Sequence, residues 1–458
     1  MYVLEQLGEF IIAHVFRTLT REQKEAVGLL QIGTFLEYFD LMLYMHMAVF
    51  LNEIFFPKTD PHTAGLLTAF AFCSTFVLRP FGALLFGYLG DNIGRKSTVI
   101  ITTMMMAVSC ITIANLPTYA QIGVSAAWII TGCRIVQGLS SMGEIIGAEI
   151  YLSELTKPPA RYPVVSLIAF SSAFGTTASL AVASLFTAFE FNWRIAFWIG
   201  AAIAVIGSVA RTRLRETSDF SEMKKRVKHM IKTKQKYKNI DSDWLLGVKK
   251  VGKKTALAYF LATCAWPACF YFAYIHCGSI LKNEFGYTAE QVIHQNFFVS
   301  IAGLISCFVV SMLSYKIHPV KIAKLRFFLF FPFILVFPIL MKVLPTANTL
   351  FFVQLFSVSA ALSTIPAASV IIMYFPVLRR FTYTSAIYAL SRALVYVITS
   401  FGLVHLTELY GYMGILVIMI PISLAFYWGM RHFEHLEQEA GVLPYTKEHQ
   451  YKIVKVAA

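Results

Sequence analysis

The sequence alternates between long apolar stretches and short segments rich in charged or turn-forming residues. Runs of about 17 to 25 apolar residues are long enough to cross the hydrocarbon core of a bilayer as a helix. Twelve such runs are present, with approximate cores at residues 27–51, 64–89, 98–116, 121–152, 162–188, 193–213, 255–281, 292–316, 321–342, 347–376, 382–407 and 411–431.

These runs predict helices rather than strands. A backbone segment in hydrocarbon must pair its own N–H and C=O groups, which a helix does within a single segment. The strands of a membrane barrel would alternate polar and apolar residues, and none of the runs does so. We therefore expect an all-α membrane protein with twelve transmembrane helices in two six-helix halves.

The largest change in composition divides the chain after the sixth run. A basic linker at 214–254 is predicted to join an N-terminal bundle at 27–213 to a C-terminal bundle at 255–431. Residues 1–26 lack the positive start and cleavage site of a signal peptide, so an interfacial helix is expected there. Residues 432–458 form a predicted tail. We find no strong residue-level repeat between the halves.

The positions of Lys and Arg predict the orientation. With the N-terminus inside, 32 of the 39 Lys and Arg residues fall on the cytoplasmic side and three on the opposite side. This imbalance follows the positive-inside rule, so both termini are expected in the cytoplasm. The remaining four lie within the predicted spans, at Arg79, Arg134, Arg194 and Arg392.

Composition removes several other classes of protein. Hydrophobic residues make up 57% and charged residues 14%, against about 25% charged in soluble domains. A net charge of +14 would suggest a nucleic-acid partner in a soluble protein, but the basic linker is expected to lie beside anionic lipid instead. The seven cysteines show no metal-ligand spacing, so no metal site is expected.

Charged residues inside the spans are candidates for function, because a charge at the bilayer centre costs roughly 2.5 to 3.5 kcal/mol. In the first span Gly33, Glu37, Asp40 and Tyr44 follow steps of four, three and four residues, which places them on one helix face. Two carboxylates one turn apart repel each other when both are charged. This pair can therefore carry a proton near neutral pH.

The fourth span places Arg134, Gln137, Ser141 and Glu144 on one face. Arg134 and Glu144 are ten residues apart, or about 15 Å along a helix axis, so they cannot pair with each other. Each needs a partner on another helix, a ligand or water. A structural ion pair between helices is the alternative to a substrate contact.

The eleventh span places Ser385, Tyr388, Arg392 and Tyr396 on one face. Arg392 has no charged neighbour in its own span, and a planar guanidinium matches a carboxylate through two parallel hydrogen bonds. Contact with an anionic substrate is one interpretation. Pairing with a carboxylate of the first span is the other.

Enzyme signatures are missing. The sequence has no nucleophile elbow, zinc-protease motif, nucleotide-binding glycine loop or paired Cys/His cluster. We therefore expect neither an enzyme nor a cofactor, and ATP is not expected to drive the protein directly. Transport powered by an ion gradient is the remaining function.

Several short motifs resemble the major facilitator superfamily. Residues 87–96 read GYLGDNIGRK, and residues 134–138 read RIVQG. The segments EYFD at 37–40, RPFG at 79–82 and GEIIGA at 143–148 are similar to its metabolite/proton symporter family, which includes proline/betaine, 2-oxoglutarate and shikimate carriers. The resemblance is strong over about residues 28–220 and weak in the second half.

The resemblance implies alternating access by rocking of the two halves, with the substrate bound near the bilayer midplane between them. It also implies a cytoplasmic latch that breaks and reforms without touching the substrate. The residues expected in this latch are Gly87, Asp91, Gly94, Arg95, Lys96 and Glu216.

The second half departs from the family. Residues 314–319 read SYKIHP where the family usually repeats its latch motif, and the glycine pair of span eleven is replaced around residues 396–397. The tail is too short for the coiled coil of osmosensing carriers. Span five lacks the Gly-Pro motif of drug antiporters, which favours symport over drug export.

These observations predict a secondary transporter of the bacterial inner membrane that imports a small carboxylate-bearing or zwitterionic metabolite with protons. Glu37 and Asp40 are the predicted proton-coupling residues. The predicted substrate contacts are Arg134, Arg392, Tyr44, Gln137, Glu144 and Tyr388, and Arg79 is expected to help orient them.

Two alternatives remain at this point. One is export or exchange of a specialised organic metabolite such as a siderophore, which the divergent second half permits. The other is a receptor that kept the fold and lost transport. The expected partners are a small molecule, protons and the lipid bilayer, with no nucleic acid, and a monomer is expected.

Overall fold

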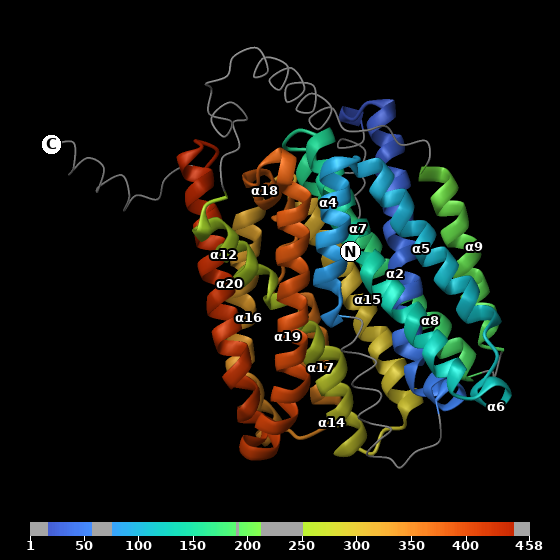
Figure 1. The fold of residues 1–458 in the computed structure, drawn as a ribbon. Helices are drawn as coiled ribbons and strands as arrows, with labels where there is room; N and C mark the ends of the chain where they lie inside the picture. The colour runs from blue at the N-terminus through green and yellow to red at the C-terminus, as the bar shows by residue number, and fades with distance from the viewer. Residues whose placement is uncertain (1–16, 57–75, 189–191, 212–250, 444–458) are drawn as a thin grey trace.

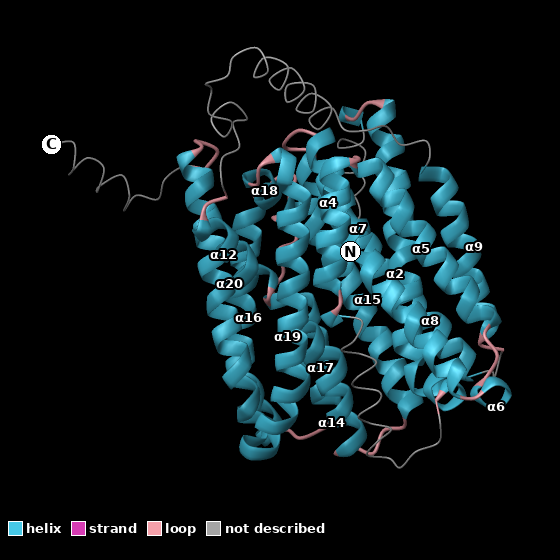
Figure 2. Cartoon of the chain, viewed as in Figure 1, coloured by secondary structure: helices cyan, strands magenta, loops and turns pink. Residues whose placement is uncertain are grey.

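The computed structural model describes residues 17–56, 76–188, 192–211 and 251–443. In this part of the chain Figure 1 shows a bundle of long helices that run up and down side by side. Figure 2 shows only helices, loops and turns within the same ranges. Apolar sequence and internally satisfied backbone therefore give the all-helical architecture that the sequence predicts.

The helices of the first half follow the predicted runs to within several residues, except that residues 64–75 of the second run lie outside the described residues. They are α2 (Arg21–Phe55), α4 (Arg79–Asn92), α5 (Arg95–Asn115), α6 (Tyr119–Ile122), α7 (Val124–Leu155), α8 (Arg161–Ala188) and α9 (Arg194–Arg211).

The second half begins after the predicted linker, most of which lies outside the described residues. Its elements are α12 (Lys253–Thr263), α13 (Ala265–Phe270), the π-helical η1 (Tyr271–His276), α14 (Cys277–Asn283), α15 (Ala289–Leu313), α16 (Pro319–Val343), α17 (Ala347–Ser359), α18 (Ala368–Ile371), the 3₁₀ turns η2 (Ile372–Tyr374) and η3 (Val377–Arg379), α19 (Arg380–Tyr410), the 3₁₀ turn η4 (Gly411–Met413) and α20 (Gly414–Glu439). Within the described ranges of both halves, seven helical stretches are long and apolar enough to cross a membrane.

The predicted tenth span is not one continuous helix. α17 ends at Ser359, and residues 360–367 are not helical before α18 begins at Ala368. Non-helical backbone at membrane depth is tolerated where protein surrounds it or where it lines a cavity. Residues 360–363 are buried, in agreement with that rule. Apolar composition does not distinguish a broken span from a whole one.

Close packing in the first half depends on glycine at two positions. A Cβ at Gly175 in α8 would collide with the carbonyl oxygen of Phe35 in α2. A Cβ at Gly82 in α4 would collide in the same way with the carbonyl oxygen of Leu139 in α7. A side chain at either position would push the two helices apart.

The two halves meet where α8 packs on α15 and where α4 packs on α19. They also meet at the end of the bundle that carries Arg95, Arg161, Lys316 and Arg379, which we name the basic end. It lies at the top of Figure 1. The charge distribution predicts that the basic end faces the cytoplasm.

Candidate functional site

A central cavity with a volume of about 130 Å³ lies between the two halves. Helices α2, α4, α7 and α8 line it from the first half, and the second half contributes α13, η1, α15, α16, α17 and α19. Its charged residues are Arg79, Arg326, Arg392 and Glu149. Its aromatic residues are Tyr38, Phe76, Trp266, Phe270, Tyr274, Tyr388 and Tyr396. Three cations against one carboxylate favour an anionic group in this space.

Arg79 and Arg392 form the first cationic pole of the cavity. The guanidinium carbon of Arg79 lies 4.3 Å from the centre of the Phe76 ring, and that of Arg392 lies 3.2 Å from the centre of the Tyr388 ring. Both arginines are buried, and their charges act on each other. Nε and Nη2 of Arg79 have no hydrogen-bond partner among the described residues, so donors remain for a ligand.

Two predicted substrate contacts, Arg392 and Tyr388, line this cavity, as does Arg79. Their places follow from helix spacing, because the face of α19 that carries them packs toward the other half of the molecule. Arg392 Nη1 also donates a hydrogen bond of 3.5 Å to the carbonyl oxygen of Tyr388 in the preceding turn. The guanidinium is therefore held along its own helix and over an aromatic ring.

Glu149 is a cavity residue that the sequence reasoning missed. It lies in α7 one turn after Ile145, and both residues line the cavity. The side chain is 7% exposed, and the charge of Arg392 acts on it. The available signal was an acidic residue inside the apolar run at 121–152, five positions after the predicted Glu144.

Arg326 is the second unexpected residue of the cavity. The charge census counted it on the cytoplasmic side with Lys316, Lys321 and Lys324, although the predicted run 321–342 includes it. It lies within α16 and is 7% exposed. The charge census therefore missed a fifth arginine within the spans. Three lysines in the preceding ten positions hid it, because a charge count cannot locate the residue at which a helix enters the membrane.

Three other predicted substrate contacts lie away from the central cavity, inside the first half. Arg134 Nη1 donates a hydrogen bond of 3.0 Å to Gln137 Oε1, and its guanidinium carbon lies 4.1 Å from the centre of the Tyr44 ring. Gln137 Nε2 in turn lies 3.5 Å from the Cys110 sulfur in α5. Spacing correctly placed Arg134 and Gln137 on one face of α7, but that face packs against α2 and α5.

The predicted proton-coupling pair also lies within the first half. Glu37 and Asp40 line a small pocket between α2, α5 and α7, whose volume of about 10 Å³ is room for roughly one water molecule. Asp40 is 1% exposed and lies beside the Cys110 thiol. Neither of its carboxyl oxygens accepts a hydrogen bond of ordinary geometry from the described residues. A buried carboxyl group in this setting is suited to hold a proton.

The last predicted substrate contact, Glu144, belongs to α7, and its side chain lies outside the described part of the structure. Arg194, which was counted among the span arginines, has a structural contact. Its Nη1 donates a hydrogen bond of 2.9 Å to the carbonyl oxygen of Ala114, and its guanidinium lies over the Trp193 ring.

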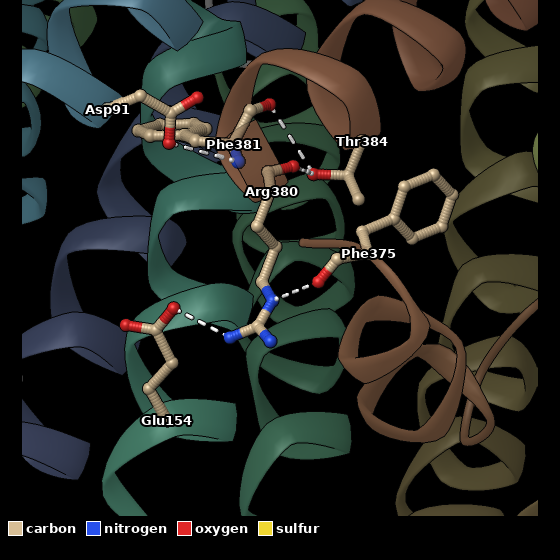
Figure 3. A network of polar contacts seen from close by, with 6 residues as sticks. All are labelled: Asp91, Glu154, Phe375, Arg380, Phe381 and Thr384. Atoms are coloured by element: carbon tan, nitrogen blue, oxygen red, sulfur yellow. Dashed lines mark hydrogen bonds and ion pairs between the residues drawn. The ribbon is translucent and has the colours of Figure 1, made fainter. Parts of the chain in front are cut away.

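The predicted latch closes the basic end. Oδ2 of Asp91 accepts hydrogen bonds from the backbone N–H of Thr382 at 2.9 Å and from its hydroxyl at 2.6 Å. Oδ1 of the same carboxylate lies 3.4 Å from the N–H of Phe381, as Figure 3 shows. A carboxylate at the N-terminus of α19 is favoured by the unpaired N–H groups and by the helix dipole. Asp91 thus joins the first half to the second.

A buried ion pair, which the sequence reasoning did not find, strengthens this closure. Arg380 Nη1 lies 2.8 Å from Glu154 Oε1, and Arg380 Nε donates a hydrogen bond to the carbonyl oxygen of Phe375 (Figure 3). Glu154 is the penultimate residue of α7 in the first half, and Arg380 begins α19 in the second. The two charges are visible in the sequence, but the residues are 226 positions apart, so the pairing could not be inferred from it.

The remaining latch residues are placed in part. Gly87 packs against the Cα of Thr382, where a Cβ would lie 2.8 Å away. Gly94 has a φ of 116°, a conformation that favours glycine, and Arg95 and Lys96 begin α5 immediately after it. The side chain of Arg95 and the whole of Glu216 lie outside the described residues.

A different cluster stands where the repeated latch motif is missing. His318 Nε2 lies 3.0 Å from Glu437 Oε2, and the Tyr374 hydroxyl donates a hydrogen bond of 2.6 Å to Glu437 Oε1. The ring of Tyr162, from the start of α8, lies edge-on to His318 at 5.7 Å. Burial would raise the pKa of Glu437, but the hydrogen bonds from His318 and Tyr374 outweigh it, and the net pKa is lowered.

Comparison with known proteins agrees with this geometry. The profile of the Major Facilitator Superfamily matches residues 30–400. The chain belongs to this superfamily. The resemblance found in the sequence motifs is thus confirmed, and so is the expectation of a transporter rather than an enzyme.

Curated relatives match part of the chain. The proline/betaine transporter of Salmonella typhimurium strain LT2 is 32% identical over 206 residues, which cover 43% of this chain and 41% of the relative. The inner membrane metabolite transport protein YhjE of Escherichia coli K12 is 35% identical over 209 residues, covering 43% and 47%. The chain therefore spans less than half the length of these relatives.

Solved structures of the superfamily share the fold over nearly the whole chain. The proton:xylose symporter XylE bound to 6-bromo-6-deoxy-D-glucose has a TM-score of 0.67 at 16% identity, covering 92% of this chain and 96% of that one. The human organic anion transporter MFSD10 has the same TM-score and identity, with coverages of 90% and 100%. The predicted twelve-helix fold is confirmed, and the chain is a multi-pass membrane protein.

Proposed function

We propose that the protein is a proton-coupled symporter that imports a small carboxylate-bearing or zwitterionic metabolite by alternating access. Its place would be the bacterial inner membrane, with both termini in the cytoplasm and a monomer as the working unit. The observation that carries the proposal is the central cavity between the halves, which holds Arg79 and Arg392 over aromatic rings and, among the described residues that line it, one carboxylate, Glu149.

The first cationic pole supports an anionic group on the substrate. Two guanidinium nitrogens of Arg79, Nε and Nη2, have no hydrogen-bond partner among the described residues, and a buried guanidinium is stabilised by a carboxylate that accepts such bonds. Glu149 lies within electrostatic reach of Arg392. A substrate ammonium group could pair with Glu149 while its carboxylate pairs with the arginines, which is why zwitterions belong to the proposed class.

Asp40 is the residue that we propose carries the coupled proton, with Glu37 beside it in the same small pocket. Asp40 and Arg134 are linked through Cys110 and Gln137 across three helices. A change in the charge of Asp40 would therefore alter the packing of α2, α5 and α7. This links proton binding to movement of the first half without placing the proton in the substrate cavity.

Uptake into proteoliposomes tests the proposal. Substrates found by a thermal-shift screen of carboxylates, amino acids and betaines should accumulate when the lumen is alkaline, and the gradient should drive no net efflux. Asp40→Asn should abolish accumulation and keep exchange of labelled for unlabelled substrate. Glu290→Gln, at an exposed position in α15, is the control. Undiminished accumulation in both Asp40→Asn and Glu37→Gln would show that the pair does not couple transport to protons. Efflux of the substrate driven by the proton gradient would overturn the proposed direction of transport.

A further inference from the structure

The break in the tenth span puts polar backbone into the wall of the central cavity. Residues 360–367 are not helical, and Ser363 and Thr364 within them line the cavity. The end of α17 directs its last carbonyl groups toward this segment. A helix C-terminus carries partial negative charge and is stabilised by a nearby cation.

Arg326 supplies that cation from α16. Its Nη2 donates a hydrogen bond of 3.2 Å to the carbonyl oxygen of Ser359, the last residue of α17, and its Nη1 donates one of 3.1 Å to the Ser363 hydroxyl. The Ser306 hydroxyl donates a further hydrogen bond of 2.6 Å to the same Ser359 oxygen. These contacts give Arg326 one role, which is to hold the broken span in place.

The contacts do not use the whole guanidinium group. Its Nε is buried and has no partner among the described residues, although the residue lines the cavity. The ionisable groups that act on Arg326 are the thiols of Cys307 and Cys269, which do not neutralise a cation. A buried cation whose neighbours are uncharged is stabilised by an anion that arrives with a ligand.

Arg326 stands apart from the first cationic pole. α16 packs against α17 and α20, whereas Arg79 and Arg392 come from α4 and α19, which pack against each other. Arg79 and Arg392 act on each other's charge, whereas neither is among the groups that act on Arg326, so the cavity carries positive charge at two separate places. Among the described residues that line the cavity, three arginines and one glutamate give a formal charge of +2, which a dianion would balance.

We infer that Arg326, with Ser363 and Thr364 of the broken span, forms a second anion subsite of the central cavity, so that the favoured ligand carries two separated acidic groups. One acidic group pairs with Arg79 and Arg392, and the other meets Arg326 and the two hydroxyls. The inference rests on the proposed function, because both subsites belong to one substrate cavity.

Binding to the purified full chain in detergent tests the inference without any variant. Malonate, succinate, glutarate and adipate are compared with the monoacids of the same chain length, propionate, butyrate, valerate and hexanoate, and with succinamate, at one pH and constant ionic strength. A second charged contact should give at least one dianion an affinity about tenfold or more above its monoanionic counterpart. Equal affinities across these pairs would overturn the second subsite. A chain that binds neither acids nor zwitterions would instead overturn the proposed function.

Variants locate the second subsite. Arg326→Gln and Ser363→Ala should bring the affinity for the best dianion toward that of the monoanion, and the monoanion affinity should stay within about twofold. Arg392→Gln should weaken both ligands. Arg194→Gln, a span arginine outside the cavity, is the matched control. Equal losses for dianion and monoanion in Ser363→Ala, which keeps the arginine, would show a merely structural role and overturn the inference.

Discussion

The Asp91 carboxylate accepts two hydrogen bonds from Thr382, one from the backbone N–H and one from the hydroxyl, although the residues are 291 positions apart. This contact fastens the end of α4 in the first half to the first turn of α19 in the second. It involves no residue of the central cavity, so its effects on gating and on substrate binding are separable.

Asp91→Asn should loosen the first turn of α19. A neutral amide accepts weaker hydrogen bonds than a carboxylate and has no negative charge for the helix dipole to stabilise. We therefore expect a loss of roughly 1.5 kcal/mol of local stability. Hydrogen exchange at Phe381 and Thr382 should accelerate about tenfold. Asn92→Ala is the control, because it removes a neighbouring exposed side chain that donates a hydrogen bond to the Tyr88 carbonyl oxygen in the preceding turn of α4. Unchanged exchange in Asp91→Asn would show that the contact does not hold the gate.

The buried pair of Arg380 and Glu154 should behave differently when one or both partners are removed. Arg380→Met leaves a carboxylate without its cation in a buried site, which typically costs about 3 to 5 kcal/mol. The double variant Arg380→Met with Glu154→Leu removes both charges and should recover most of that loss. Thermal unfolding of the purified variants measures the difference. A double variant that is less stable than Arg380→Met would contradict the expected coupling.

Glu437 predicts an acid-dependent contribution to stability at the basic end. Its hydrogen bonds lower the pKa in the folded protein, so the carboxylate stabilises the fold at pH values above its unfolded pKa of about 4.3. That contribution is lost as the pH falls through the lower folded pKa. Wild type should therefore unfold at a higher temperature than Glu437→Gln at pH 6 to 7, and the gap should close below about pH 4. Glu439→Gln, at an exposed position, is the control. A difference in unfolding temperature that widens in acid would contradict a stabilising role of the Glu437 carboxylate.

Gly200→Ala tests the position of Asp40. A Cβ at Gly200 in α9 would collide with Oδ1 of Asp40, so the carboxyl group would have to move. Overpacking of this kind costs about 1 to 3 kcal/mol, and proton-driven accumulation should fall with it. Gly132→Ala in α7 has open space around the new methyl group and should retain both stability and accumulation. Full accumulation in a folded Gly200→Ala protein would argue against proton coupling at Asp40.

Sequence patterning predicted the helices and the faces of the charged residues, because lipid permits few backbone conformations. It could not assign neighbours to those faces. Arg392 and Arg134 both have correct helical registers, but α19 turns its charged face to the cavity and α7 turns the face of Arg134 toward α2 and α5. The contact partner of a helix face depends on packing that spans the whole chain.

Arg326 illustrates a second limit. Three lysines precede it in the sequence, so the charge census counted it with the cytoplasmic residues. In the structure α16 begins at Pro319 and carries Arg326 two turns into the bundle, where the broken span provides its hydrogen-bond partners. Pro366 lies within that break and is the one local signal for it. Proline alone does not decide the matter, because Pro332 and Pro338 lie inside the continuous helix α16.

The ring of Phe381 lies between two glycines of the first half. A Cβ at Gly90 in α4 would collide with this ring, a Cβ at Gly147 in α7 would lie 3.2 Å from it, and the ring itself is fully buried. An aromatic side chain seated in a socket of this shape is either inserted or withdrawn, because partial withdrawal leaves an unfilled void. Opening of the basic end is therefore expected to be a discrete, all-or-none event, with single molecules switching between two states rather than drifting through intermediate widths.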